Sequence, residues 1–384
     1  MPGLFASLVL AVPSIWIVDA AGGAGAHFVD LPTAVAAAAH GDTLLIRAGT
    51  YAPFSTTGKA LLLRRDGPGP VLVTPTFAAP AGAFIGAPPA GSTFVVSGIR
   101  FAPSGLWSTS TTALTVSGPG FFLLHETECS GAQDASAGGV GLHVTNGATL
   151  RLSKCAVFGG PASHPFFLGA PVGGDALRAE SGARVAADAT SFLGGFASGG
   201  AAFGGAGARI VDAEATLARC TTAGGGVSEF GPYLSAAGDG VVASGAASVR
   251  VSGGAAHSAA GGLGGGGAAS GFAASATGGA VVTVHDGVTL ASAHPSGPTS
   301  GSTILGAPRL PTVATGGPPA LSGGLSASDV VSVVFESGLP FAPYLFLVDV
   351  SAGYSTAYAA FALGEVLVPV PPAVVIEGAL GADG

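Results

Sequence analysis

Two aspartates, Asp175 and Asp239, have the residue type and the spacing to do chemistry together. Each follows a glycine and occupies the same position in a repeating apolar pattern, whereas the repeat unit between them carries Gly205 there. If successive units stack as neighbouring strands, two steps place the carboxyl groups roughly 10 Å apart. That separation is near the upper end of the range, about 6.5–9.5 Å, in which inverting glycosidases hold their acid and base. Arg178 lies close by in the sequence.

This pair allows two interpretations. In one, Asp175, Asp239 and Arg178 form a catalytic flank that acts on a polysaccharide. In the other, which we favour, each aspartate caps a turn through its own backbone, as Asp beside Gly commonly does. The separation is too large for one calcium ion to be bound directly by both carboxylates, since Ca–O distances are about 2.3–2.6 Å.

Histidines and aromatic residues add little to this candidate site. The eight histidines share no position in the repeat, so the sequence predicts no metal site and no cofactor. Trp16, Trp107 and Tyr233 either stack on sugar rings, if they are exposed, or fill core and corner positions, which is the commoner use of isolated aromatic residues.

Composition narrows the class of protein. Only 9% of the 384 residues are charged and 48% are hydrophobic, but 66 glycines and 27 prolines divide the apolar residues into short bursts. That pattern predicts many short buried strands with tight turns. A disordered chain lacks such a supply of core residues, and the glycines keep no three-residue period, which excludes collagen. The net charge of −8 and the lack of a basic stripe argue against nucleic acid as a partner.

Residues 4–12, LFASLVLAV, have the length and hydrophobicity of an export signal, although no basic residue precedes them. We expect residues 1–14 to be a signal that is cleaved between Ala11 and Ser14; the alternative is a first core strand. Residues 15–18 predict the first strand of the mature chain. No later apolar run approaches the roughly 20 residues needed to cross a bilayer, so we expect a secreted or cell-surface protein without a transmembrane span.

Residues 27–51, HFVDLPTAVAAAAHGDTLLIRAGTY, predict a short helix and then a strand. Asp30 or Thr33 caps the helix, which covers about 31–39 and is followed by a strand at 43–47. This passage resembles the beginning of pectin-lyase-like right-handed parallel β-helix proteins, in which such a helix covers the open end of the coil and Gly-Asp, a strand and Gly-Thr-Tyr follow. The resemblance covers about 25 residues and implies a fold rather than an activity.

An internal repeat predicts the same architecture. Two apolar columns, two residues apart, recur with separations of 28, 35, 30, 34 and 39 residues. The first column is Phe122, Leu150, Val185, Ala215, Val249 and Val288, and the second is Leu124, Leu152, Ala187, Leu217, Val251 and Leu290. Because the columns keep step while the unit length varies, the insertions must lie outside the aligned strands. The columns therefore predict parallel strands stacked coil on coil around a continuous core.

A further apolar burst precedes the first column in several units, at residues 114–116, 142–144, 176–177 and 241–242. Each coil thus predicts two or three short strands separated by corners. The Gly-rich segments 160–173, 196–206 and 259–279 are expected to be excursions from one flank. The fold class is therefore all-β, with a right-handed parallel β-helix over residues 15–308.

The pattern changes near the C-terminus. A Pro/Gly-rich link at 309–324 predicts a boundary, and the longer alternating segments beyond it predict a small antiparallel β appendage at 325–384. The expected strands are 329–336, 344–350, 358–363 and 366–376. The appendage either shields the edge of the last coil or serves as a sorting or attachment module.

The three cysteines fall into the repeat. Cys155 and Cys220 follow the second column by three residues, where neighbouring coils carry Thr127 and Thr190, and Cys129 lies two positions further along. All three side chains should therefore point into the core. Cys155 and Cys220 are two coils apart, roughly 10 Å, and the diagonal from Cys129 to Cys155 is about 8 Å, whereas a disulfide needs Cα atoms within about 7 Å. We expect three buried free thiols.

The family that the chain resembles includes polysaccharide lyases and glycosidases. A pectate-lyase-type site resembles a cluster of Asp and Glu that binds calcium beside an Arg or Lys base, and this sequence does not match that pattern in full. We therefore expect a non-catalytic extracellular or cell-surface protein with a structural, adhesive or glycan-contact role, whose partner is a polysaccharide or cell-envelope glycan. The alternative is a polysaccharide lyase or glycoside hydrolase that acts along one face through Asp175, Asp239 and Arg178.

Overall fold

The protein is described by a computed structural model. It describes residues 13–75, 82–102, 112–163, 170–199, 201–229, 235–252, 258–260, 271–284, 289–291, 304–305, 320–325, 331–336, 343–348 and 374–379.

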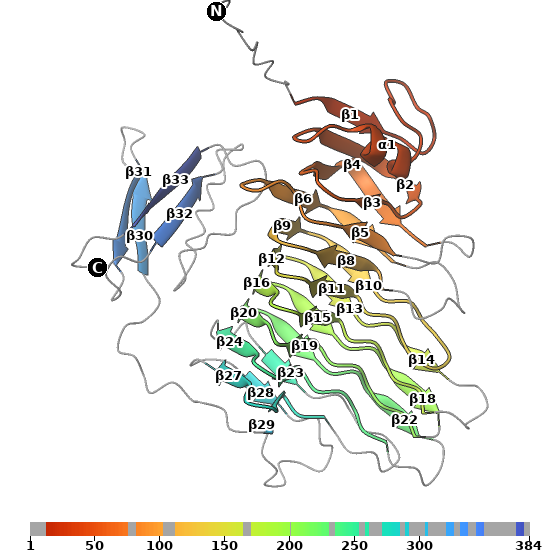
Figure 1. The fold of residues 1–384 in the computed structure, drawn as a ribbon, viewed down its shortest axis with the longest axis vertical. Helices are drawn as coiled ribbons and strands as arrows, with labels where there is room; N and C mark the ends of the chain where they lie inside the picture. Colours follow the sequence, from red (N-terminus) through yellow and green to blue (C-terminus); the bar gives the residue numbers. More distant parts are fainter. Residues whose placement is uncertain are drawn as a thin grey trace, which may run out of the picture.

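Parallel strands stack coil on coil along one long axis (Figure 1). The largest sheet has 17 strands in two rows. Its first row is β1 Ile15–Val18, β2 Thr43–Tyr51, β4 Leu62–Val73, β6 Thr93–Ser97, β9 Gly120–His125, β12 Ala148–Ser153, β16 Arg184–Asp188, β20 Glu214–Ala218, β24 Ser248–Ser252 and β27 Val281–Val284. Its second row is β7 Ile99–Phe101, β10 Glu128–Ser130, β13 Ala156–Phe158, β17 Ser191–Leu193, β21 Thr221–Ala223, β25 Ser258–Ala260 and β28 Thr289–Ala291, with the end of β4 paired to β7.

A nine-stranded sheet forms another side of the coils. Its strands are β3 Ser55–Thr56, β5 Ala83–Ile85, β8 Leu114–Ser117, β11 Leu142–Thr145, β15 Leu177–Glu180, β19 Ala208–Val211, β23 Val241–Ser244, β26 Ala274–Ala276 and β29 Ile304–Leu305. A small three-stranded sheet at the end of the longest coils consists of β14 Ala162–Ser163, β18 Ala197–Gly199 and β22 Val227–Glu229.

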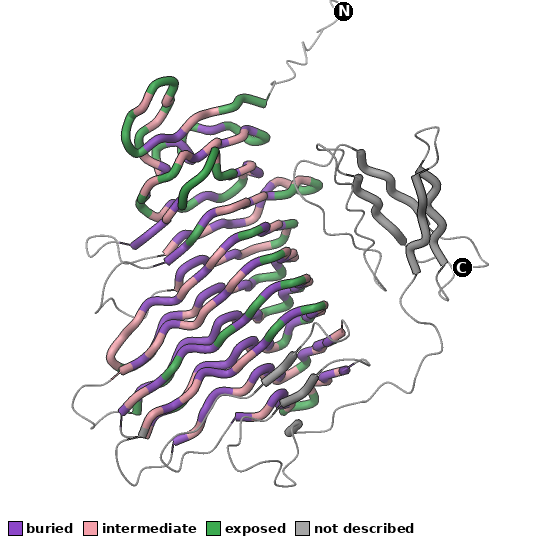
Figure 2. Tube along the Cα trace, turned by 180° about the vertical axis from the view of Figure 1, so that it is seen from behind, coloured by how far each residue is buried: buried purple, intermediate pink, exposed green. Residues whose placement is uncertain are grey.

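The core is built from the apolar columns of the sequence. Phe122 pairs with Leu150, and the column continues in register through Val185 and Ala215 to Val249. All five side chains are buried, and Figure 2 shows buried stretches recurring from coil to coil. Side chains of a strand point alternately to its two faces, so the two-residue spacing of the columns keeps both of them inside. The predicted stacking of parallel strands is confirmed.

The structure corrects the last step of the columns. Val249 pairs with Val282 rather than Val288, and the second column ends at Val284 rather than Leu290. Leu290 lies in β28, the second-row strand of that coil. Both segments carry an apolar alternation, so the columns alone could not separate them. Gly278 and Gly279, both with positive φ, form the corner that precedes β27 and so mark it as the first-row strand of its coil.

Thr127, Cys155, Thr190 and Cys220 form a ladder at the corner between the two rows. Each lies just after a non-glycine residue with φ between 47° and 53°. Each buried hydroxyl or thiol donates a hydrogen bond to the carbonyl oxygen two residues earlier, over 2.9–3.3 Å. Cys129 is also buried and lies in register with the next strand as predicted. All three cysteines are free thiols inside the core.

A row of glycine pairs, here called the glycine waist, joins the outgoing and returning segments of the longest coils. Its members are the pairs 138–139, 159–160, 173–174, 194–195, 204–205 and 224–225. Gly174 donates to the carbonyl of Gly160, Gly195 to that of Gly174, and Gly205 to that of Gly195, each over 2.8–2.9 Å. A Cβ atom at any of these positions other than Gly139 would overlap a backbone carbonyl of the facing or neighbouring segment. The segments therefore meet backbone to backbone, and a second small apolar cluster lies beyond them.

A short helix, α1 Leu31–Ala37, lies against the first coils. Of the two candidate caps, Asp30 is the one used, because its Oδ1 accepts from the N–H of Thr33 over 2.8 Å. The helix ends two residues before the predicted 39. Lys59 supplies the reason, since its ammonium donates to three carbonyls at the helix end, those of Val35, Ala36 and Ala38.

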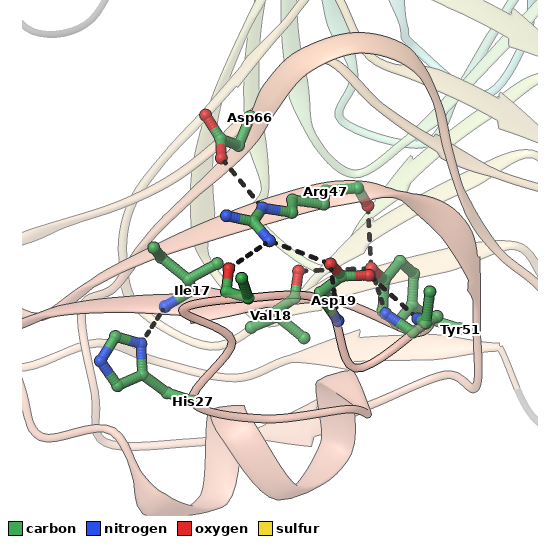
Figure 3. Close-up of polar contacts among 11 residues, drawn as sticks. Ile17, Val18, Asp19, His27, Arg47, Tyr51 and Asp66 are labelled. Carbon is green, nitrogen blue, oxygen red and sulfur yellow. Dashed lines mark hydrogen bonds and ion pairs between the residues drawn. The ribbon is translucent and has the colours of Figure 1, made fainter.

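Polar contacts fix the first strand to the coil beneath it (Figure 3). Arg47 on β2 donates to Asp19 over 3.0 Å, and the hydroxyl of Tyr51 donates to the carbonyl of Arg47 over 2.8 Å. On the outer edge of β1, Nδ1 of His27 accepts from the N–H of Ile17 over 2.9 Å. The backbone of residues 27 and 28 also bonds along this edge, so His27 and Phe28 together cover part of the outer edge of β1.

Near the C-terminus two antiparallel pairs are described. β30 Ala320–Leu325 pairs with β31 Val331–Glu336, and β32 Pro343–Val348 pairs with β33 Val374–Ala379. β30 begins inside the segment that the sequence suggests as a link. The predicted strand at 358–363 and the apolar segment 4–12 lie outside the described residues.

Candidate functional site

The outer face of the nine-stranded sheet carries a row of polar side chains from three consecutive coils. His143 on β11 pairs with Arg178 on β15, which pairs with Arg209 on β19. Their chain neighbours Leu177 and Ala179 are fully buried, so alternation along the strands directs the three polar side chains outward. About 4.8 Å separates successive coils. The row therefore runs along the axis of the stack.

Asp175 lies beneath this row and joins two of its members. Its Oδ2 accepts from Nε of Arg209 over 2.8 Å and from Nη2 and Nε of Arg178 over 2.8 and 3.2 Å. Its Oδ1 accepts from the N–H of Ala206 on the next coil over 3.0 Å. Asp175 is 3% exposed, whereas the side chains of Arg178 and Arg209 are 41% and 36% exposed. One buried carboxylate thus anchors two half-exposed guanidinium groups.

The charges of this group reinforce one another. Burial works to raise the pKa of Asp175, but the hydrogen bond and charge of Arg209, with the charge of Arg178, hold that pKa below its ordinary value. Burial works to lower the pKa of Arg209, but the hydrogen bond and charge of Asp175 and the charge of Asp239 hold it above its ordinary value. Asp175 is therefore a fixed anion and Arg209 a fixed cation at neutral pH.

Asp239 has a different environment from Asp175. Its Oδ1 accepts from the N–H of Phe272 over 2.8 Å and its Oδ2 from the hydroxyl of Ser275 over 2.6 Å. Both aspartates thus stabilise turns, but through the backbone of the following coil and not through their own. The register also corrects the residue between them, because Ala206 holds this position. Gly205 belongs instead to the glycine waist.

The hydrogen bonds of the two aspartates oppose an acid–base role. One coil lies between them, so the strand register separates them by roughly 10 Å. A general acid needs a proton at working pH, and the lowered pKa of Asp175 opposes that. Both oxygens of each carboxylate already accept hydrogen bonds from this chain. The group can hold cations in place and present donors to a ligand.

Sequence reasoning found Asp175, Asp239 and Arg178 but missed Arg209 and the contact of His143 with Glu180. Nε2 of His143 lies 2.9 Å from a carboxylate oxygen of Glu180. Arg209 could have been found from the sequence Ala208-Arg209-Ile210, which repeats the apolar–polar–apolar pattern of Leu177-Arg178-Ala179 one coil later. Residues 208–210 are absent from the apolar bursts on which the prediction was based.

The remaining candidates lie elsewhere. Trp16 donates from Nε1 to Asp42 over 2.8 Å and packs edge-on against His27 and Phe28, so it is a packing residue of the first coil. Trp107 and Tyr233 lie outside the described residues. Within the part of the chain that is described, no group of three His, Cys, Asp or Glu side chains could hold a metal ion. No helix among those residues has the length and apolar character to span a membrane.

Comparison with known proteins finds similarity in structure and not in sequence. No protein-family model and no curated protein matches the chain. Among solved structures, it is similar to the pectate lyase Pel9A, at 13% identity and a TM-score of 0.24, over 73% of this chain and 79% of that one. It is also similar to the Dettilon tailspike protein, at 10% identity and a TM-score of 0.21, over 82% of this chain and 80% of that one.

Each strand pairs in parallel with the corresponding strand of the next coil, and this register defines the architecture. The protein is a right-handed parallel β-helix. The low TM-scores and identities carry no argument about the site of this β-helix. Its chemistry must be inferred from its own residues.

Proposed function

We propose that this β-helix is a non-catalytic extracellular or cell-surface protein that contacts a glycan through the outer face of its nine-stranded sheet. The observation that carries the proposal is the anchoring of Arg178 and Arg209 by the buried Asp175. Side chains that are held in one orientation before binding lose little entropy when a ligand arrives. A guanidinium group also presents several donors in a plane, which suits the oxygen-rich surface of a glycan.

The direction of the row favours an extended ligand. His143, Arg178 and Arg209 come from consecutive coils, so they recur along the axis at about 4.8 Å. A polymer that lies along the axis can contact all three, which span roughly 10 Å, and can continue along the sheet beyond them. The weak but repeated contacts of a long chain add up through effective concentration.

A binding role agrees better with the site than a catalytic one. Asp175 holds two arginines and a backbone N–H, and Asp239 holds Ser275 and a backbone N–H. Moving either carboxylate to a substrate would break these contacts. The extracellular location in this proposal is supported by residues 4–12, which have the length and hydrophobicity of an export signal.

Binding to immobilised polysaccharides tests the proposal. The full chain should be retained by at least one polysaccharide of a panel of neutral and acidic polymers, and Arg178→Ala with Arg209→Ala should abolish retention. Arg184→Ala on the outer face of β16 is the matched control, since Arg184 is an exposed arginine of the other sheet. Equal losses in the control and in the double variant would overturn the proposed site.

The same preparation tests the catalytic alternative. Polygalacturonate incubated with the protein and calcium should release no unsaturated uronides, and calcium should leave the melting temperature unchanged. Release that disappears in Asp175→Ala or Asp239→Ala would replace the binding role with a lyase or hydrolase activity.

A further inference from the structure

Both guanidinium groups of the site are tied to a single oxygen atom. Nε of Arg209 and Nη2 of Arg178 each lie 2.8 Å from Oδ2 of Asp175. Those two nitrogens can be no further apart than twice that distance. The two arginines therefore converge, although they come from neighbouring coils.

Several donors of this pair remain uncommitted. Arg209 uses only Nε, which leaves Nη1 and Nη2 without a partner among the described residues, and Arg178 likewise leaves Nη1. Both side chains keep more than a third of their surface exposed. The buried carboxylate thus fixes the inner edges of the guanidinium groups and leaves outer nitrogens for a ligand.

The number of donors selects the shape of the anion. A carboxylate has only two oxygens, both in one plane, whereas three guanidinium nitrogens of this pair are left for a ligand. A sulfate or phosphate monoester presents three outer oxygens in a tetrahedral arrangement, so it can accept from two converging guanidinium groups at once.

We propose that Arg178 and Arg209, positioned by Asp175, form a subsite for a tetrahedral oxyanion, so that the glycan bound by this protein carries sulfate or phosphate ester groups. This inference rests on the proposed glycan-binding function and adds the chemical class of the ligand. Asp175 is a positioning residue in this scheme, because its oxygens face the arginines and not the ligand.

Asp239 is one of the opposing charges, together with Asp175 and with Glu180, which lies on the same face of β15 as Arg178. Its field reaches Arg209, and its oxygens are directed to Phe272 and Ser275 on the following coil. A carboxylate at this place disfavours every anion alike. It therefore lowers affinity without changing the preference between anions, and Asp239→Asn should tighten binding of sulfated and carboxylated ligands by the same factor.

One polymer backbone with different substituents provides the test. Binding of the full chain to dextran, carboxymethyl-dextran, dextran sulfate and dextran phosphate is measured by titration at one ionic strength and one degree of substitution. We expect the sulfated or the phosphorylated polymer to bind at least about tenfold more tightly than carboxymethyl-dextran, because its third oxygen allows a further charged hydrogen bond. The two tetrahedral arms show which ester is preferred.

The variants locate the effect. Arg178→Ala and Arg209→Ala should each reduce affinity for the preferred ester about tenfold, and the control Arg184→Ala should change it less than about twofold. Arg209→Lys keeps the charge but removes the fork, so it should lower the preference for ester over carboxylate. Asp175→Asn should lower that preference too, and its melting temperature shows how far its fold is kept.

The outcomes separate the two levels of the proposal. Equal, arginine-dependent affinity for carboxymethyl-dextran and for the esters overturns the tetrahedral subsite but leaves glycan binding in place. Ester affinity that is unchanged in Arg178→Ala and Arg209→Ala overturns the subsite as well. No binding to any glycan, here or in the wider panel, overturns the proposed function itself.

Discussion

Asp175 and Arg209 lie on consecutive coils, and a 2.8 Å hydrogen bond joins Oδ2 of the first to Nε of the second. Oδ1 of Asp175 accepts from the N–H of Ala206 on that same next coil. The carboxylate therefore ties two coils together through a side chain and through the backbone. Because it is almost fully buried, its contacts are shielded from water more than those of a surface ion pair.

Acid should weaken this tie. Since the arginines hold the pKa of Asp175 below its ordinary value of 3.8, the unfolded chain takes up the proton at a pH where the folded chain does not. The contribution of Asp175 to the free energy of unfolding is therefore complete above the unfolded pKa and is lost as pH falls through the folded one.

Chemical unfolding of the wild type and of Asp175→Asn, followed between pH 3 and pH 7, measures that contribution. At neutral pH we expect the variant to be about 2 kcal/mol less stable, as for the loss of a charged hydrogen bond. The difference should shrink below about pH 4. A gap that is the same at pH 3 and at pH 7 would contradict the assigned role.

The link at 309–324 remains a prediction from composition, and limited proteolysis tests it. Arg309 is the last Lys or Arg of the chain, so a single tryptic cut there releases residues 310–384. We expect this cut before any inside the coils, where the outward arginines lie on hydrogen-bonded strands. A broad-specificity protease provides the second measurement. If it cuts within 160–173 first and leaves 309–324 intact, the boundary is misplaced.

Much of the fold could be predicted from the sequence, because core positions of a β-helix repeat at every coil. Phe122, Leu150 and Val185 are large and apolar and recur in step with the second column, and the structure stacks them in register. The step to Val288 failed because that segment also alternates. Apolar alternation identifies a strand, but it does not say in which row of the coil the strand lies.

The site was harder to predict than the core. Asp175 and Arg178 are neighbours in sequence and were found together, whereas Arg209 lies one coil away. Its contact depends on which residue faces Asp175 across the coils, and a one-residue error there placed Gly205 where Ala206 lies. An outward side chain leaves no apolar column by which to align it, so its partners follow only from a correct register.

The corner ladder explains why free cysteines suit the core of this protein. The thiols of Cys155 and Cys220 donate to carbonyl oxygens as Thr127 and Thr190 do. Burial raises the pKa of Cys155 to about 11 and that of Cys220 to about 12, and it raises the pKa of Cys129 as well. The reactive thiolate is therefore scarce at neutral pH.

Thiol labelling measures this directly. In the native state, labelling at pH 7 should be slow and limited by opening of the coils. After unfolding without reductant, three thiols per chain should react. One reactive thiol under those conditions would reveal a native disulfide and contradict the register.

Cys220→Thr tests the ladder itself. Threonine restores the residue type of the neighbouring coils, keeps a donor for the carbonyl of Ala218 and needs little extra room. We expect a change in the free energy of unfolding below about 1.5 kcal/mol. Cys220→Val, of similar size but without a donor, leaves that carbonyl without this bond and should cost about 1 kcal/mol more. Equal stability of the two variants would show that the hydrogen bond contributes nothing.

We expect the largest loss in the free energy of unfolding from substitutions in the glycine waist. A methyl group at Gly205 would overlap the carbonyl oxygen of Gly174 on the preceding coil, and backbone cannot rotate away as a flexible side chain can. The two segments would have to separate, which also opens the hydrogen bond from Gly205 to Gly195 and loosens the small cluster beyond the waist. We expect Gly205→Ala to cost about 3 kcal/mol or more.

Gly182→Ala is the matched control. Its positive φ of 75° carries strain, but nothing lies within 4 Å of the new methyl group, so it should cost only about 1–2 kcal/mol. Denaturant unfolding of both variants decides between overlap and backbone strain. If the two cost the same, the waist tolerates a methyl group and close backbone contact does not explain its glycines.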